Sequence, residues 1–149
     1  RQQARVYALK QVKREGDFSL NIIENQIRNN AVGIYTNSSL SDEVCDRAGL
    51  GNNPYTNSGP NFYFEDKFGN WFRYSIDQNA ISSASAIANT VALTTSTVQI
   101  TNLSLTCNRS AAYSTPLINI SFDVNYNGSQ FQEQIASLHY QTQIEMKNY

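Results

Sequence analysis

The spacing of apolar side chains changes once along this chain, and that change limits the class of fold that it can adopt. Residues 1–30 contain no proline and carry apolar side chains at the intervals of three and four that are typical of an α-helix. From residue 62 onward, apolar side chains recur mainly at every second position, the period of a β-strand with one buried face. The sequence therefore predicts an α+β fold in which a long N-terminal helix packs on a four- to five-stranded antiparallel sheet.

Part of the predicted helix forms a narrow stripe that we expect to face the sheet. The stripe consists of Leu9, Val12, Gly16, Leu20, Ile23 and Ile27. Arg5 falls on the same stripe, so the core-facing pattern begins only after the first turn or two, and the helix is expected to protrude from the domain there. Gly16 costs about 1 kcal/mol of helix propensity relative to alanine, but it lets a sheet approach closely.

A second, sparser apolar set lies on the opposite side of the same helix and includes Ala4, Tyr7, Phe18 and Ile22. A helix that packs on one face does not need this set. Two explanations remain open: the loop that follows the helix covers these side chains, or another molecule does. Tyr7, Phe18 and Ile22 are therefore candidate contacts with a partner.

The chain is predicted to be a single domain over residues 1–149, a length typical of one domain. Residues 1–30 form the helix, residues 31–61 a long connecting loop, and residues 62–149 the sheet region. The loop contains Asp42, Glu43 and Asp46, whose oxygens could hold a calcium ion. Their spacing fits no EF-hand loop, which favours a solvated acidic loop instead.

Within the sheet region, a hairpin is predicted from residues 62–64 and 71–76 around a turn at residues 66–70. Later strands are predicted at residues 98–107, 118–126 and 138–147. A β-bulge is expected near Thr101–Asn102, because the apolar alternation changes phase there. Residues 80–97 are small and polar, and we expect them to be weakly structured or to form a short helix.

Several classes of function lack the residues that they would need. Eleven basic and twelve acidic side chains give a net charge of −1, which does not support a global nucleic-acid or membrane-surface footprint. His139 is the only histidine, so a site with several histidine ligands is excluded, and its position on the polar side of a strand favours a surface role. No nucleotide-binding or nucleophile-elbow motif is present. We therefore predict no catalytic residue, no metal site and no cofactor.

Two local features are open to alternative interpretations. Cys45 and Cys107 are the only cysteines, one in the predicted loop and one in a predicted strand, and they either form a disulfide or remain free thiols. The run from Trp71 to Tyr74 places a basic residue among aromatic ones, as platforms that stack single-stranded nucleic acid do. Since the run holds one base within a strand, core packing is favoured over nucleic-acid binding.

Four stretches of the chain resemble a known family. Residues 4–18, continuing through 27–29, are similar to the second half of the helix of type IV pilins and type II secretion pseudopilins. Residues 62–76 resemble the first hairpin of small bacterial pilin-like proteins, and residues 98–107 and 144–149 fit the same proteins. The resemblance covers most of the chain.

The resemblance implies a structural filament subunit rather than an enzyme. In such proteins an apolar helix half precedes the position of Arg1, anchors the precursor in the inner or cytoplasmic membrane, and forms the filament core after cleavage and N-methylation at a phenylalanine. The expected partners are other pilin subunits and, before assembly, the membrane. The expected location is an extracellular pilus on the cell surface that serves motility or adhesion, with Tyr7, Phe18 and Ile22 as subunit contacts.

Two alternatives to the structural subunit remain. The chain could be a minor or tip pilin that acts as a surface binding module, either an adhesin or a DNA-uptake receptor, although nucleic-acid binding has weak support in the sequence. It could also be a pseudopilin of a type II secretion system. Without the apolar helix half, the chain is expected to be monomeric and soluble.

Overall fold

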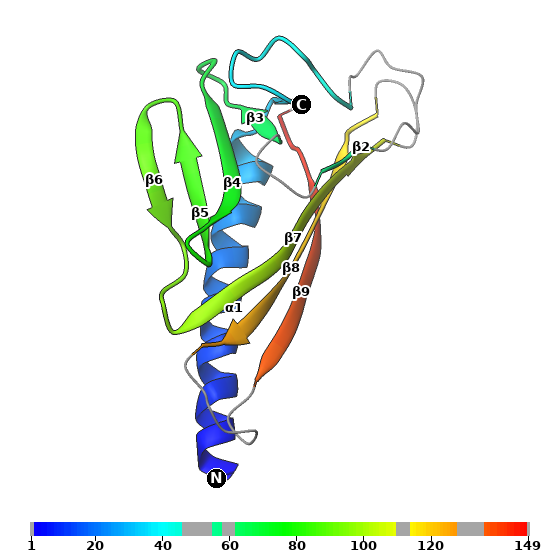
Figure 1. Cartoon of the computed structure of the whole chain (residues 1–149). Coiled ribbons are helices and arrows are strands. Elements are labelled where there is room, and N and C mark those ends of the chain that lie inside the picture. Colours follow the sequence, from blue (N-terminus) through cyan, green and yellow to red (C-terminus); the bar gives the residue numbers. More distant parts are fainter. Residues whose placement is uncertain (1, 46–54, 58–61, 110–113, 128–135, 149) are drawn as a thin grey trace.

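The computed structural model describes residues 2–45, 55–57, 62–109, 114–127 and 136–148. Helix α1 spans Gln2–Asn30, and antiparallel strands pack against it (Figure 1). The α+β fold predicted from the sequence is confirmed. Arg28 lies in the last turn of α1, where a positive charge interacts favourably with the helix dipole.

The described strands form two sheets, whereas the sequence predicted one. The five-stranded sheet has the order β1-β3-β4-β5-β6. Its strands are β1 (Gly33–Tyr35), β3 (Tyr63–Glu65), β4 (Trp71–Asp77), β5 (Ala80–Ser85) and β6 (Ala88–Ala92). The four-stranded sheet has the order β2-β7-β8-β9. Its strands are β2 (Tyr55–Asn57), β7 (Val98–Asn108), β8 (Leu117–Tyr126) and β9 (Ser137–Glu145).

The predicted first hairpin is confirmed as β3 and β4, which pair Phe64 with Phe72. The Asp66 carboxylate holds the turn: its Oδ1 accepts hydrogen bonds from the backbone N–H groups of Phe68 at 2.9 Å and Asn70 at 3.0 Å. Gly69 has φ +81°, a conformation that glycine adopts without the penalty a side chain would bring. Local turn chemistry therefore fixes the register of this hairpin.

The predicted bulge in β7 is also confirmed. The pairing of β7 with β8 shifts register between Thr101 and Ser104, and Asn102 inside the shift has φ 58°. Asparagine tolerates this left-handed conformation better than most residues. The bulge lets both phases of the apolar alternation reach the same core, because Ile100 before it and Leu105 after it are both 1% exposed.

Two predictions about the middle of the chain were wrong. Residues 80–97 contain the paired strands β5 and β6 rather than a weakly structured segment or a helix. Their alanines and serines carry no clear period, but β5 pairs with β4 and β6 pairs with β5, which adds both strands to the sheet. The stretch predicted as a continuous loop, residues 31–61, contains the short strands β1 and β2, which pair with β3 and β7.

Helix α1 packs mainly on β8 and β9 of the four-stranded sheet. Gly16 makes this packing possible, because a Cβ atom at that position would lie 2.2 Å from the ring of Tyr140 on β9. At the other end of the helix, the backbone N–H of Lys147 and the Asn148 side chain donate to the carbonyls of Arg28 and Asn29. The chain end after β9 therefore satisfies carbonyl groups that the helix end leaves unpaired.

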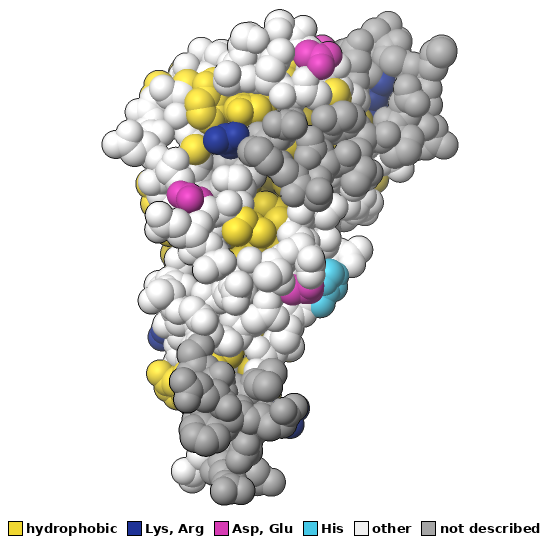
Figure 2. Space-filling model, in the orientation of Figure 1, with side chains coloured by type: hydrophobic (Ala, Val, Ile, Leu, Met, Phe, Trp, Pro, Cys, Tyr) yellow, Lys and Arg dark blue, Asp and Glu magenta, His cyan; other side chains and the backbone are white. Residues whose placement is uncertain are grey.

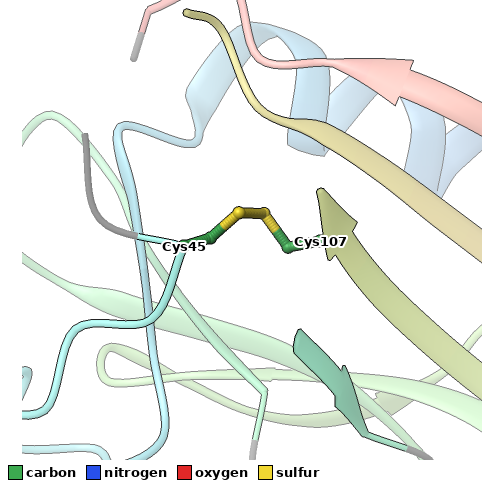
Figure 3. The surroundings of a disulfide bond; sticks show 2 residues. All are labelled: Cys45 and Cys107. Carbon is green, nitrogen blue, oxygen red and sulfur yellow. A yellow bond between two sulfur atoms is a disulfide. The ribbon is translucent and has the colours of Figure 1, made fainter. Parts of the chain in front are cut away.

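The disulfide between Cys45 and Cys107 is present, so the free-thiol alternative is excluded (Figure 3). Its Cα atoms are 6.2 Å apart, and it joins residues separated by 62 positions. Cys45 follows β1 of the five-stranded sheet, and Cys107 is a fully buried residue of β7 in the four-stranded sheet. The N–H of Val44 donates to the Ile34 carbonyl of β1 at 2.9 Å, so the bond links a segment held against the five-stranded sheet to the four-stranded sheet.

Candidate functional site

The two faces of α1 differ sharply in exposure, and the outer face is the candidate site. Of the six residues predicted to face the sheet, Val12, Ile23 and Ile27 are fully buried and Gly16 is buried against β9. Leu9 and Leu20 are half-buried and pack against the core. Arg5 is exposed and Ala8 is fully buried, so the buried face begins at about the second turn of the helix.

The buried face is wider than the predicted stripe on one side, where Ala8, Glu15 and Ser19 are all buried. Glu15 is 6% exposed, and its carboxylate accepts hydrogen bonds from the backbone N–H of Thr95 at 3.3 Å and from the Thr95 hydroxyl. A buried carboxylate needs such partners to offset lost hydration. The apolar period could not reveal this anchor, since it requires a contact with the segment between β6 and β7.

The three predicted partner contacts divide into two exposed residues and one half-buried residue. Tyr7 is 56% exposed, with its ring packed edge-on against Tyr126 at 6.5 Å, and Phe18 is 57% exposed. Ile22 is half-buried. Val6, which the sequence analysis did not single out, is 50% exposed. The outer face of α1 therefore presents Val6, Tyr7 and Phe18 to solvent among polar and charged neighbours.

The basic part of α1 surrounds these apolar side chains. Lys10, Lys13 and Arg14 are exposed, and Lys13 forms an ion pair with Asp17 at 2.8 Å. The side chains of Lys13 and Asp17 are 69% and 47% exposed, so the pair contributes little to stability and remains available for exchange with other charges. Figure 1 shows the first turns of α1 extending beyond the ends of the described strands.

The aromatic run of β4 is split between two faces of the five-stranded sheet. Phe72 and Tyr74 face α1, and the buried Tyr74 donates its hydroxyl to Gln26 of the helix. Burial raises the pKa of Tyr74 far above its ordinary value. Trp71 and Arg73 lie on the opposite face. Core packing, the interpretation favoured from sequence, therefore describes one half of the run.

Trp71 and Arg73 form a cluster with Tyr63 of β3. The Arg73 guanidinium lies over the Tyr63 ring at 5.2 Å and over the Trp71 ring at 5.9 Å, and it donates to the Tyr63 hydroxyl at 3.0 Å. All three side chains are half-buried. Figure 2 shows hydrophobic side chains and a basic one gathered over the upper strands on this face of the molecule.

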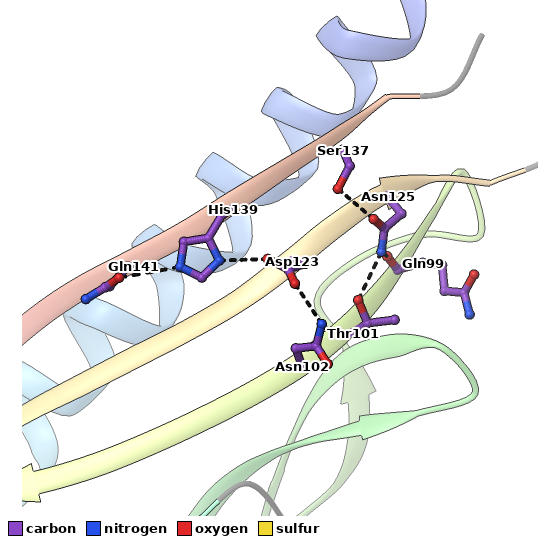
Figure 4. A network of polar contacts seen from close by, with 8 residues as sticks. All are labelled: Gln99, Thr101, Asn102, Asp123, Asn125, Ser137, His139 and Gln141. Atoms are coloured by element: carbon purple, nitrogen blue, oxygen red, sulfur yellow. Dashed lines mark hydrogen bonds and ion pairs between the residues drawn. The ribbon is translucent and has the colours of Figure 1, made fainter. Parts of the chain in front are cut away.

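His139 lies in a polar network on the outer face of the four-stranded sheet (Figure 4). Its Nδ1 is 2.7 Å from Asp123 Oδ1, and the other oxygen of Asp123 accepts a hydrogen bond from Asn102 at 2.8 Å. The Asp123 contact raises the pKa of His139, and the bonds from Asn102 and His139 lower the pKa of Asp123. The network connects side chains of β7, β8 and β9. The His139 side chain is exposed, so His139 lies at the surface, as predicted.

The acidic residues of the predicted loop have local partners. Thr36 donates its hydroxyl to Asp42 at 2.5 Å, and its backbone N–H bonds the Asp42 carbonyl. Asp46, the third residue of that group, lies outside the described residues. Among the residues that the structure describes, no group of three or more potential ligands gathers in a way that could hold a metal ion.

Comparisons with models of protein families, with curated proteins and with solved structures found no match for this chain. Within the described part of the chain, no helix is both long enough and apolar enough to cross a membrane.

Proposed function

We propose that this chain is a structural subunit of a bacterial type IV pilus or a related filament, and that α1 is its assembly element. One observation carries the proposal. A helix of 29 residues packs one face into the domain while its other face exposes Val6, Tyr7 and Phe18, each at least half accessible to solvent. Tyr7 and Phe18 lie three turns apart on one side of the helix, about 16 Å along its axis, and this row of exposed rings is the surface that we assign to a partner.

The wider features of the chain support a structural role. Under this proposal an apolar segment precedes Arg1 in the full-length protein, holds the precursor in the membrane, and becomes part of the filament core. The Cys45–Cys107 disulfide suits an extracellular location, because disulfides persist in oxidising compartments. The chain acts through its surfaces, and the proposal assigns it no catalytic residue and no cofactor.

The experiment compares two double variants of the full-length protein in cells that assemble the filament. Tyr7→Ser with Phe18→Ser removes both exposed rings, and Asn21→Ser with Asn25→Ser is the matched control on the same exposed face. We expect the first variant to lower the yield of sheared filaments about tenfold, as loss of an interface hot spot does. The control should assemble normally.

Thermal melting of the 149-residue chain separates assembly from folding. The melting temperature of the Tyr7→Ser, Phe18→Ser chain should remain within a few degrees of the parent value, since exposed side chains contribute little to stability. Normal filament yield in that variant would remove the role assigned to this face. A collapse of the melting temperature would show that Tyr7 belongs to the fold through its contact with Tyr126.

The Tyr63–Trp71–Arg73 cluster favours a second candidate function, that of a surface binding module such as a tip adhesin or a DNA-uptake receptor. Aromatic rings beside a guanidinium can stack with bases. If this function holds, the chain should retain a single-stranded oligonucleotide on a filter at low salt. Trp71→Ala should abolish the retention. Absence of retention at low salt would remove the nucleic-acid form of this candidate.

A further inference from the structure

The most exposed large apolar side chains of the described residues lie at the tips of two neighbouring turns. Phe68, in the β3–β4 turn, and Ile87, in the β5–β6 turn, are each 78% exposed. Figure 1 shows both turns at the end of the molecule where α1 ends. Turn tips are normally polar, so two large apolar residues there require an explanation.

A groove of about 400 Å³ runs between these two turns and the last turns of α1. Phe72 and Ala84 contribute apolar surface to it, Phe68 and Ile87 border it, and Gln26 and Asn30 of α1 line its other side. This combination of apolar surface with a few polar groups is typical of sites that receive a side chain or a small ligand.

Both turns that border the groove are held in place by hydrogen bonds. Asp66 fixes the β3–β4 turn through the N–H groups of Phe68 and Asn70. The β5–β6 turn is tied to β4, because the N–H of Ala86 donates to the carbonyl of Trp71 at 3.0 Å. The groove is therefore formed before any partner arrives, which reduces the ordering cost of binding.

We propose that this groove receives Phe18 from α1 of a second copy of the chain. The inference rests on the proposed function and names the two surfaces that meet in the filament. Phe18 is exposed, and Ile22 one turn further along extends the same apolar ridge. The ridge supplies an aromatic side chain that no described part of its own chain buries.

Charges around the two surfaces are complementary. Arg14 and Asp17 precede Phe18 within one turn of α1, and Asp66 and Lys67 line the groove. In the proposed contact, Asp17 of one copy pairs with Lys67 of the next and Arg14 pairs with Asp66, so that opposite charges meet beside the ring. Such an arrangement fixes the register of a contact more than it adds affinity.

The positions of the two surfaces along α1 fix how the copies are arranged. Phe18 precedes the groove residues Gln26 and Asn30 by eight to twelve positions, which correspond to about 12–18 Å of helix at 1.5 Å per residue. Two copies with parallel helices would therefore be staggered by that distance. Because the ridge and the groove are different surfaces, the contact repeats from copy to copy and builds an open filament.

Cysteine cross-linking in filaments tests the contact directly. The substitutions Asp17→Cys and Lys67→Cys place thiols at positions that the proposal brings together, and they leave Phe18 in place. The native cysteines are already bonded to each other. We expect oxidised filaments to give a ladder of covalent multimers. Asp17→Cys with Asp77→Cys, which lies at the other end of β4, should give none.

Charge reversal tests the same pairing without a new covalent bond. Lys67→Glu alone and Asp17→Lys alone should each lower filament yield severalfold, and the two changes together should restore it. Filaments that form without the cross-linked ladder, or single reversals that the double variant does not rescue, would overturn this inference and leave the proposed function standing. If the unsubstituted full-length protein forms no filaments at all, both fall.

Discussion

The two sheets of this protein are stabilised by different kinds of side chain. In the four-stranded sheet, β8 buries Ile118, Ile120, Phe122 and Val124 completely at every second position. In the five-stranded sheet, aromatic residues of β3 and β4 share the core with Ile34 and Ile81, whereas every residue of β6 is exposed. No charged residue or histidine occurs between Gln78 and Asn108, a range that contains both β5 and β6.

The difference shows two ways in which a strand is stabilised: by burial of its own side chains, or by backbone hydrogen bonds to neighbouring strands. Every other residue of β8 adds buried apolar area, so the strand is stabilised by its own side chains. Strand β5 buries Ile81 and Ala84, whereas β6 buries none of its side chains and depends on backbone pairing with β5 and on anchors such as the Glu15–Thr95 contact in the segment that follows it. We expect the five-stranded sheet to loosen first, and the following variants test that expectation.

The largest effect should come from the covalent link between the sheets. Cys45→Ala with Cys107→Ala opens a loop between residues 62 positions apart, for which the chain-entropy model gives about 4 kcal/mol of lost stability. Urea unfolding of this variant against the oxidised parent measures the loss. Amide exchange should accelerate in β1 before it does in β8. Equal unfolding midpoints would show that packing alone holds the sheets together.

Truncating one valine in each sheet compares how much side-chain burial contributes to the stability of the two sheets. Val124 on β8 is fully buried and Val91 on β6 is 54% exposed. Val124→Ala should cost about 2–3 kcal/mol, because it removes two buried carbons and leaves a cavity. Val91→Ala should change the free energy of unfolding by about 0.5 kcal/mol or less. Similar losses in the two variants would contradict the distinction between the sheets.

A third variant examines how closely the four-stranded sheet approaches α1. Gly16→Ala should destabilise the chain by about 1–3 kcal/mol through overpacking, because the new Cβ would meet the Tyr140 ring. That ring is itself stacked on Phe122 at 5.7 Å, so it has little room to move. Urea unfolding of the variant measures the loss.

The control for this variant removes the ring. In a Tyr140→Ala background, the same Gly16→Ala change should stabilise the chain by about 1 kcal/mol, since alanine favours the helix. A change of sign between the two backgrounds identifies the ring as the cause. Destabilisation in both backgrounds would place the conflict elsewhere.

The comparison of the sheets also explains what the sequence could predict. Side-chain alternation predicted β7, β8, β9 and the first hairpin. Asp66 and Gly69 predicted the turn of that hairpin. Strands β5 and β6 went unrecognised, because alternation is visible only where large apolar side chains alternate with polar ones. The sequence predicted one sheet because the segments with visible alternation numbered only five. The structure adds β1, β2, β5 and β6, which show no such alternation, and the strands divide into two sheets.

For the candidate site, sequence could place residues on a helix face but not choose their partners. Tyr7 and Phe18 followed from the helical period, and they are exposed. The groove bordered by Phe68 and Ile87 is lined by two turns and a helix end that lie far apart in the sequence, so no local sequence pattern predicts it. The same holds for Glu15, whose burial depends on the distant Thr95.

The smallest expected effect concerns the polar face of the four-stranded sheet and its response to pH. His139 and Asp123 bond at 2.7 Å, with side chains 58% and 27% exposed. The pKa of His139 is raised, so its contribution to stability is complete below its unfolded pKa of about 6.5 and is lost as pH rises through the folded pKa. The pKa of Asp123 is lowered, so its contribution is complete above an unfolded pKa of about 3.9 and is lost as pH falls through the folded one.

The pair should therefore stabilise the fold mainly between about pH 4 and pH 6.5, and only slightly because of its exposure. Since His139 is the only histidine, one imidazole resonance reports its titration by NMR. Asp123→Asn should return the pKa of His139 toward its ordinary value. Asn102→Ala should have a smaller effect on His139, because Asn102 bonds the other oxygen of Asp123. If Asp123→Asn leaves the His139 titration unchanged, the carboxylate does not set that pKa, and this face does not respond to pH through the pair.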